Sequence, residues 1–506
     1  MIDRDAQDKP RGHAPVAVID IGSNSVRLVV YECRSRVPKV LYNEKALCGL
    51  GKNLVKTTRL DEQAVAMALG TLKRFALLCR HLGALEIYTL ATAAVREAQN
   101  GTDFITDVSA ILGKEAIVLS GEEEALYSAY GVMSSFFRPC GIVGDLGGGS
   151  LELVDISRDT IGDGLTLPLG GLRLKDMSLN DLNQAGEIAH QHLKNLSLLS
   201  KASGQNFYAV GGTWRNLAKL HMATKDYPLP IMHGYEVNGA EMYKFLQKIR
   251  DYGLDSLQSI SSISKNRRQL LAYGAQVLEA ILAYQKPEKL LFSGAGVREG
   301  FLFSQLSKKQ RAQDPLLAAC EEFASLQARS QQQVSELITF SDRTFDAFGI
   351  VENENEYRYR KAACLLIDVA WRLDADYRGS FAACKIALGS YLCISHLGRI
   401  YAALSAFYCH EGLNSDTPPP DFISLASDAI IQKASILGGI LRLANVLSPA
   451  ASGILPKFSW RKKKHALQLH VPADYRDLIA DRPHNRLRQL AKFTGLDLSF
   501  SVGDSP

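Results

Sequence analysis

The chain has 506 residues, of which 46% are hydrophobic and 22% charged, a composition typical of a soluble globular protein with three or four domains. A formal net charge of +5 is too small to indicate nucleic-acid binding by itself. We expect a cytoplasmic protein without a membrane span, because the polar first residues resemble no signal peptide, no apolar run reaches ~18 residues, and the cysteines show no metal-binding or disulfide rhythm.

Strand and helix patterns alternate along the first 306 residues, which indicates α/β architecture. Residues 16–31 predict two strands joined by a polar turn, and the same pattern returns at residues 140–156, where Asp145 aligns with Asp20. We therefore expect a duplicated fold with a cleft between its lobes. The predicted segments are a disordered leader at 1–13, lobes at 14–135 and 136–306, a helical domain at 314–449 and a small α+β domain at 450–506.

The C-terminal half follows a polar linker at residues 307–314. Residues 364–373 and 381–406 are rich in Ala and Leu and predict helices. Strand patterns return at residues 465–472 and 496–502, which predicts the terminal α+β domain.

The first polar turn reads Asp20-Ile21-Gly22-Ser23-Asn24-Ser25. Glycine lets the backbone approach a ligand, and Ser23 and Asn24 add side-chain donors, so this turn could wrap a phosphate oxygen. Asp20 could contact phosphate only through a divalent cation. A simple hairpin turn explains the same residues, and the first turn alone does not decide between the two interpretations.

The second turn, GDLGGGS (144–150), places three consecutive glycines after Asp145. Each glycine loses more backbone entropy on folding than other residues, and a hairpin does not need three of them. Two such turns facing each other across a cleft favour a phosphate site. The residues predicted to grip the anion here are Gly147, Gly148, Gly149 and Ser150.

The order of these motifs resembles a known superfamily. The two turns, the later turn VGGTWRN (210–216) and the stretches ATAAVREAQNG, LSGEEEALYSAYGV and SGAGVREG are similar to the acetate and sugar kinases, heat-shock chaperone ATPases and actin. The Ser-Asn-Ser form of the first turn resembles, within that superfamily, the exopolyphosphatase and guanosine pentaphosphate phosphatase family. The resemblance is strongest over residues 16–305 and implies two ribonuclease H-like (actin-like) lobes, Mg²⁺ as cofactor and a homodimer.

The stretch LSGEEEALYSAYGV contains three consecutive glutamates. Ser120 and Glu123 have the spacing of a helix capping box, and acidic residues in a first helical turn suit the helix dipole, which explains Glu122 and Glu123. The resemblance assigns Glu124 as the general base that activates water. A carboxylate facing a polyanion at a domain junction could have the raised pKa that this role requires.

Further phosphate-binding residues follow from the resemblance. Arg96, with Thr92 in the same stretch, would grip phosphate oxygens through a forked guanidinium, although a solvated helix arginine is the alternative. Gly212 and Thr213 match the third ligand-binding turn of the superfamily. Arg267, rather than its neighbour Arg268, matches a family arginine.

Three carboxylates are candidate magnesium ligands. Asp145 is the first choice because it precedes the triple-glycine turn, Glu152 lies on the same strand face as Ser150, and Asp20 is the pseudo-symmetric partner. A hydrogen-bonding structural role remains open for each of them.

The helical region departs from family members that resemble HD-type phosphohydrolases. Ile367 stands where their histidine would fall, Asp368 is retained, and His410 lacks partners in the sequence pattern, so we predict no metal site there. The basic run KFSWRKKKH (457–465) could guide a long anionic chain, or it could be a solvated loop.

These observations predict an exopolyphosphatase that releases orthophosphate from the end of inorganic polyphosphate. The alternatives are the same chemistry on guanosine pentaphosphate, an ATP-dependent kinase or ATPase, and a non-catalytic alarmone-binding regulator. No nucleic-acid or membrane partner is expected.

Overall fold

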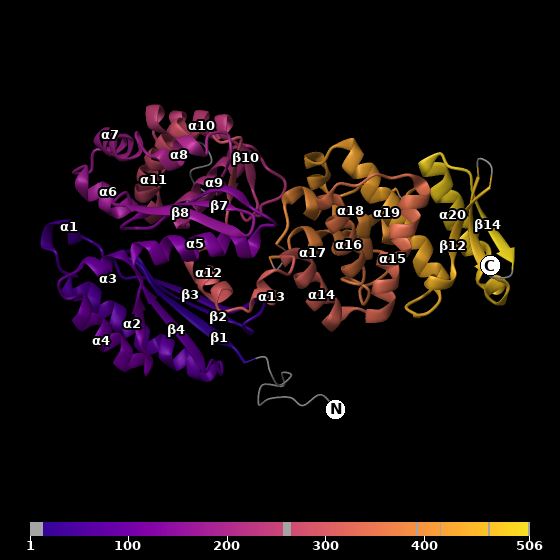
Figure 1. Ribbon diagram of the computed structural model, residues 1–506, viewed down its shortest axis with the longest axis horizontal. Helices are drawn as coiled ribbons and strands as arrows, with labels where there is room; N and C mark the ends of the chain where they lie inside the picture. The colour runs from indigo at the N-terminus through magenta and orange to yellow at the C-terminus, as the bar shows by residue number, and fades with distance from the viewer. Residues whose placement is uncertain (1–13, 257–264, 391–392, 415, 464–465, 504–506) are drawn as a thin grey trace. The chain divides into compact units, whose positions relative to one another are not determined.

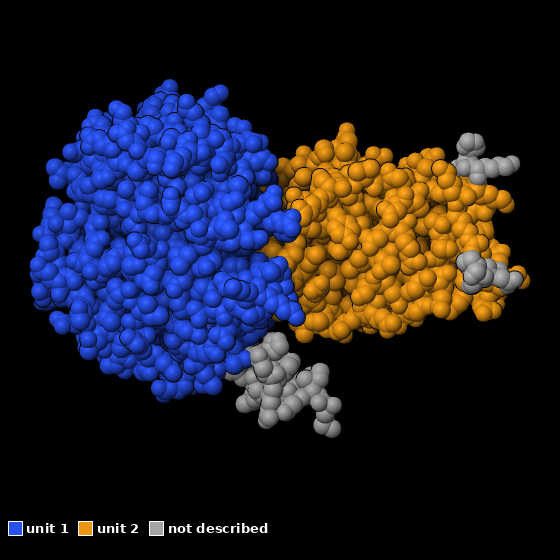
Figure 2. All heavy atoms as spheres, in the orientation of Figure 1, with its two compact units in different colours: residues 1–313 blue, residues 314–506 orange. Residues whose placement is uncertain are grey.

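The structure is a computed structural model that divides into two compact units, residues 1–313 and 314–506 (Figure 2). The boundary falls at the end of the stretch predicted to be a polar linker, where Lys308–Arg311 form the short helix α13. The residues described are 14–256, 265–390, 393–414, 416–463 and 466–503, so the predicted leader lies outside them.

The first sheet of unit 1 has five strands in the order β3-β2-β1-β4-β5 (Figure 1). β1 and β2 are the two predicted apolar strands. Ile19 of β1 and Leu28 of β2 share an apolar cluster with Phe75 of α2 and with buried residues of α4. The elements of this part are β1 (Val16–Ile21), β2 (Ser25–Tyr31), β3 (Val40–Leu47), α1 (Leu54–Thr57), α2 (Glu62–His81), β4 (Glu86–Ala91), α3 (Ala93–Glu97), α4 (Gly101–Leu112) and β5 (Ala116–Val118).

The second sheet has six strands in the order β10-β11-β9-β6-β7-β8. Its largest apolar cluster joins side chains of the sheet, such as Phe207, to side chains of helices α7, α9, α10 and α11, such as Trp214 and Leu278. The elements are β6 (Cys140–Leu146), β7 (Leu151–Ser157), β8 (Thr160–Leu167), α6 (Gly171–Met177), α7 (Leu182–Leu193), α8 (Ser197–Lys201), β9 (Asn206–Val210), α9 (Gly212–Thr224), β10 (Glu236–Asn238), α10 (Gly239–Tyr252), α11 (Lys265–Gln285) and β11 (Lys289–Phe292).

Two helices cross between the lobes. α5 (Gly121–Ser135) follows the first sheet but packs Ala125, Ala129 and Val132 against the second. α12 (Val297–Ser304) follows the second sheet but packs Phe301 and Leu302 against the first. The lobes defined by sequence order, 14–135 and 136–306, therefore each give one helix to the other's core, because each sheet needs a helix on its inner face to bury its apolar side chains.

The duplication read from the sequence is present in the hydrogen-bond register. Asp20 pairs with Arg27 between β1 and β2, and Asp145 pairs with Glu152 between β6 and β7. The turns close alike, since Gly22 N donates to Ser25 O at 3.0 Å and Gly147 N donates to Ser150 O at 3.0 Å. The two polar turns are thus equivalent structures on different sheets.

Unit 2 begins with helices and ends with a small sheet. The described residues form α14 (Pro315–Gln327), α15 (Gln331–Phe348), α16 (Glu354–Leu365), α17 (Arg378–Ala387), α18 (His396–Glu411), α19 (Asp428–Leu447), β12 (Ser459–Lys463), β13 (Ala466–Pro472), α20 (Asp481–Thr494) and β14 (Leu498–Gly503). The sheet order is β12-β13-β14, with α20 packed between α19 and β14. The α+β character predicted for the last segment is confirmed.

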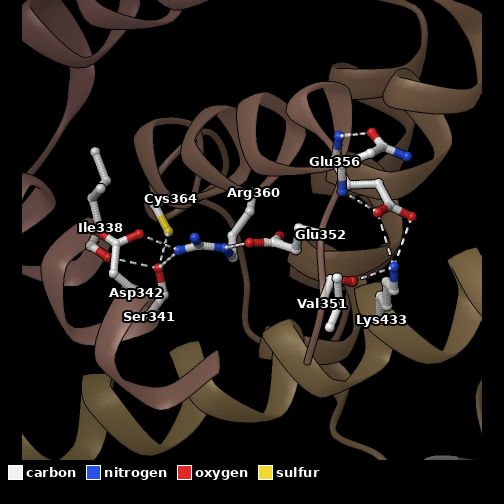
Figure 3. A network of polar contacts seen from close by, with 10 residues as sticks. Ile338, Ser341, Asp342, Val351, Glu352, Glu356, Arg360, Cys364 and Lys433 are labelled. Atoms are coloured by element: carbon white, nitrogen blue, oxygen red, sulfur yellow. Dashed lines mark hydrogen bonds and ion pairs between the residues drawn. The ribbon is translucent and has the colours of Figure 1, made fainter. Parts of the chain in front are cut away.

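The core of unit 2 contains a buried ionic network (Figure 3). Arg360 is 2% exposed, and its Nε donates to both carboxylate oxygens of Glu352 at 3.0 and 2.9 Å. Its Nη1 donates to Ser341 Oγ at 2.7 Å and pairs with Asp342 at 2.7 Å (Figure 3). These contacts tie α15, α16 and the loop between them together, and they satisfy a charge that would be costly to bury unpaired.

The structure corrects the helix expected over residues 364–373. The stretch 364–373 was expected to be helical, but α16 ends at Leu365, and Asp368 beyond it accepts from the backbone N–H and the Nε of Arg329 at 3.0 and 2.8 Å. This pairing holds the segment in a turn.

α19 is long and apolar enough to cross a membrane, but 67% of its apolar window is buried in the fold, as in the core helix of a globular unit.

Candidate active site

The two polar turns meet at one point between the lobes. A Cβ placed on Gly148 would lie 3.1 Å from Ser23 Cβ and 3.6 Å from the backbone nitrogen of Asn24. A Cβ placed on Gly149 would lie 3.0 Å from Ser23 Oγ. A side chain at either position would crowd Ser23, so glycine allows the two turns to approach this closely.

The carbonyl groups of both turns are held by the protein itself. Gly51 N and Gly49 N donate to Ser23 O and Asn24 O at 2.7 and 3.1 Å. On the other lobe, Leu172 N at the start of α6 donates to Gly148 O at 2.9 Å. These three carbonyl oxygens are therefore satisfied by hydrogen bonds within the protein.

Glu124 lies in the first turn of α5 beside Arg96. Arg96 Nη1 donates to Glu124 Oε2 at 2.9 Å and to Leu119 O at 2.6 Å, while the Glu124 residue is 5% exposed. Burial raises the pKa of Glu124 to about 7, against the opposing effect of Arg96, and Asp145 and Asp20 add to the rise. A carboxyl group of this kind is poised to accept a proton near neutral pH.

The capping box predicted for Ser120 and Glu123 is present in the structure. Ser120 Oγ accepts from Glu123 N at 3.1 Å, and Glu123 Oε2 accepts from Ser120 N at 2.8 Å, which completes the capping box. Glu122 is exposed. Only Glu124 of the three faces the interior, as the helical spacing requires.

Asp145 and Glu152 lie side by side across strands β6 and β7. Burial raises the pKa of both groups, and the charges of Glu124 and Asp145 raise that of Glu152 further. Ser128, one helical turn after Glu124, donates a short hydrogen bond to Asp145. Sequence reasoning missed Ser128, although the i, i+4 spacing from Glu124 was a usable signal.

Asp20 has a partner that sequence reasoning also missed. Arg298, in the first turn of α12, donates from Nη1 to Asp20 Oδ2 at 2.6 Å. Burial opposes the charge on Arg298, but Glu299 and Asp20 raise its pKa overall. Asp20 therefore anchors α12 to the first turn. Arg298 lies in the stretch SGAGVREG, which the sequence analysis had singled out without naming this arginine.

Two further phosphate-binding candidates are Thr92, which contacts the first turn, and Ser150, which contacts Glu152. Thr92 is the residue before α3, and its Oγ1 donates to Ile21 O at 3.4 Å, which fixes the helix that carries Arg96 beside the first turn. Ser150 is buried with Glu152, and its side chain lowers the pKa of that group by a hydrogen bond.

The third turn packs on α11. A Cβ on Gly274 would lie 2.3 Å from Thr213 Cγ2, so Thr213 faces a helix and not open space. Gly212 opens α9, and the side chain of Arg215 donates to Gly294 O at 3.0 Å. Arg267 lies in the first turn of α11, but its side chain is outside the described residues.

The donor set fits a magnesium ion. Mg²⁺ usually takes one or two carboxylates and completes its shell with water and substrate phosphates. Glu152 Oε1 is buried without a hydrogen-bond partner, and it stands next to Asp145 in an acidic environment that a cation would neutralise. Within the described parts of the chain, no group of three or more His, Cys, Asp or Glu side chains is placed to hold a metal ion.

The duplicated lobes, crossing helices and opposed glycine turns define a protein of the actin-like class, and comparison with known families makes the assignment narrower. Residues 29–309 match the model of the Ppx/GppA phosphatase family, and residues 316–501 match the model described as exopolyphosphatase, C-terminal. The chain belongs to the Ppx/GppA phosphatase family.

Individual relatives share parts of this chain. Retrograde regulation protein 2 of Saccharomyces cerevisiae is 30% identical over 61% of the chain, and the match spans 58% of the yeast protein. Exopolyphosphatase 1 of Mycobacterium tuberculosis is 26% identical over 58% of the chain and 89% of its own length. An exopolyphosphatase crystal structure from Cytophaga hutchinsonii superposes with a TM-score of 0.50 at 22% identity, over 57% of this chain and 97% of that one, which supports the fold alone.

Proposed function

We propose that this protein is an exopolyphosphatase that hydrolyses the terminal phosphoanhydride of inorganic polyphosphate and releases orthophosphate. The observation that carries the proposal is the buried Glu124, with a pKa of about 7, held by Arg96 near the meeting point of two glycine-rich turns. A base, a guanidinium and two phosphate-gripping turns are the groups that attack of water on a terminal phosphate requires.

In this proposal Glu124 orients the attacking water and accepts its proton. Both hydrogen bonds of Arg96 described above come from Nη1, so the guanidinium keeps further donors for the transferring phosphoryl group. The donors of the two turns would hold the terminal phosphates in line with the water. Asp145 and Glu152 would hold Mg²⁺, which supplies positive charge against the phosphate oxygens when bound.

A second candidate function uses the same site to bind a ligand without hydrolysing it. The name of the yeast relative describes regulation, which favours a regulator that binds the same phosphorylated ligands without hydrolysis. Guanosine pentaphosphate remains an alternative substrate, since the turns grip phosphates and not the rest of the molecule. An ATP-dependent kinase or ATPase of the superfamily is the least favoured alternative.

Several further assignments belong to the same proposal. We propose a cytoplasmic homodimer, with residues 314–449 derived from an HD-type helical domain and 450–506 as the terminal domain. Among the described residues of 314–449 the regular elements are all helices, which supports the assignment of this segment as a helical domain. Nucleic acid and membrane are not part of the proposed partners.

The proposal is tested by replacing Glu124, the proposed base. Glu124→Gln removes the proton acceptor and keeps the side-chain shape, so orthophosphate release from polyphosphate should fall at least about a hundredfold, while circular dichroism should show a folded protein. Glu122→Gln, an exposed neighbour in the same helical turn, is the matched control and should keep full activity. Near-normal release by Glu124→Gln would remove this residue from the role, and tight phosphate-ligand binding with no release by the unaltered protein would favour the regulator.

A further inference from the structure

Beside the turns lies a small open pocket. Ser23 of the first turn and Gly148 and Gly149 of the second contribute to its lining, together with apolar side chains such as Leu54 and Leu172. Because these turn residues are the ones proposed to hold the terminal phosphates, the pocket adjoins the place where the rest of a phosphate chain must continue.

The described residues that line this pocket include one acidic and one basic side chain, Glu97 and Arg173. They come from opposite lobes, since Glu97 ends α3 and Arg173 lies in α6. In Figure 1 α1, α3 and α6 lie at the same end of unit 1. The two side chains form a forked ion pair, in which Arg173 Nη1 lies 3.3 Å from Glu97 Oε1 and Nη2 makes a shorter contact with Oε2.

Arg173 is fixed to the second turn through its backbone. Its N–H donates to Gly148 O at 3.2 Å, so a movement of this turn carries Arg173 with it. Glu97 directly follows Arg96, the residue that holds Glu124. The ion pair therefore links the two halves of the site at its mouth.

A phosphate chain entering the pocket would meet a carboxylate that repels it and a guanidinium that matches it. Arginine binds phosphate in the same forked geometry that it uses for a carboxylate, so a phosphate group can replace Glu97 on Arg173. The side chains are 34% and 19% exposed, so the pair lies at the surface of the pocket, where such an exchange requires no unfolding.

We propose that Arg173 is a further phosphate-binding residue, which Glu97 occupies when no ligand is present and releases to an incoming polyphosphate chain. The inference rests on the proposed function for its ligand, but the exchange itself requires binding only. It assigns opposite roles to the two partners: Arg173 attracts the chain, and Glu97 competes with it.

The experiment compares the single variants Arg173→Gln and Glu97→Gln in the full chain. With inorganic tripolyphosphate as the probe, calorimetry in a Glu124→Gln background measures binding without turnover. Arg173→Gln should weaken binding about tenfold, because a charge-assisted forked contact is lost, whereas Glu97→Gln should tighten binding about threefold. The Arg173→Gln, Glu97→Gln double variant should bind like Arg173→Gln, because Glu97 acts through Arg173.

A pair that merely fastens the lobes predicts a different pattern. Both single variants break the same contact, so both would change binding in the same direction, and that result would overturn the inference. No change in either variant would overturn it as well. The matched control is the forked pair of Arg74 and Glu44, with contacts of 3.0 and 3.1 Å inside the first lobe, whose Gln variants should leave binding unchanged.

A parallel assay of orthophosphate release separates the two proposals. With the base intact, Arg173→Gln should raise KM for polyphosphate about tenfold and leave kcat within about twofold, since the residue holds the chain and not the reacting phosphate. Opposite shifts in tripolyphosphate binding without any release by the unaltered protein would support the exchange and reject the proposed hydrolysis.

Discussion

At the scale of single residues, the site concentrates negative charge in a buried place. Glu124, Asp145 and Glu152 all have raised pKa values because burial penalises their ionised forms and because neighbouring carboxylates, Asp20 among them, repel their charges. Such a group lowers the stability of the folded protein once it is ionised. A cluster that is costly for folding and useful for binding a cation is characteristic of a functional site.

This gives a pH-dependent prediction for Glu124→Gln in the absence of divalent metal. The unfolded group loses its proton near its ordinary pKa of 4.5 and the folded group at about 7. Stability is therefore fully present below 4.5 and falls as the pH rises toward 7, by on the order of 2–3 kcal/mol. Glu124→Gln should match the unaltered protein near pH 4.5 and melt several degrees higher at pH 8.

Melting curves across this pH range check the prediction. The exposed Glu122→Gln variant should follow the unaltered protein at every pH. A Glu124→Gln variant that is less stable than the unaltered protein at pH 8 would show that its ion pair with Arg96 outweighs the cost of burial.

At the scale of elements, the lobes are joined where α5 and α12 cross. A Cβ on Gly300 would lie 1.7 Å from Tyr127 O, and one on Gly131 would lie 2.4 Å from Gly296 O. The two backbones touch here, and no side chain fits between them. Because these helices position Glu124 and Arg298, the crossing sets the distance between the proposed base and the first turn.

Gly300→Ala should therefore destabilise unit 1 by about 2–4 kcal/mol, because the added methyl group forces the helices apart. Gly70→Ala is the matched control, since Gly70 lies in the exposed middle of α2 with nothing within 4 Å of an added Cβ, and alanine there should stabilise by up to about 1 kcal/mol. Chemical denaturation measures both. Equal stability of the two variants would mean that the crossing relaxes freely.

At the scale of the whole molecule, the proposed catalytic residues and both turns lie in unit 1. The mycobacterial relative aligns over 309 residues that make up 89% of its length, so a protein little longer than unit 1 exists in the family. Unit 2 carries the exposed side chains of Arg461, Lys462 and Lys463 on the edge strand β12. Charges on an edge strand protect it from aggregation, and they also suit an anionic chain, so both interpretations of the basic run stay open.

A chain ending at Gln313 should hydrolyse tripolyphosphate with a kcat within about threefold of the full protein, because proton transfer depends on local groups. Its KM for long polyphosphate should rise if unit 2 binds the chain. Phosphate release from both substrates, measured alongside the melting temperature of the shortened protein, checks this. A folded but inactive unit 1 would place an essential residue in unit 2.

The sequence alone determined the features that depend on local pattern. The paired strands, the two equivalent turns and the capping box follow from periodicity and spacing, because these are properties of neighbouring residues. The choice of Glu124 came from the family resemblance of its motif. Tertiary structure alone decided which distant groups meet. It paired Asp20 with Arg298, placed Ser128 on Asp145, set Glu97 against Arg173 across the lobes, and exchanged α5 and α12 between the sheets. Such contacts join residues far apart in the chain, and only the packing of the two sheets brings them within hydrogen-bonding distance.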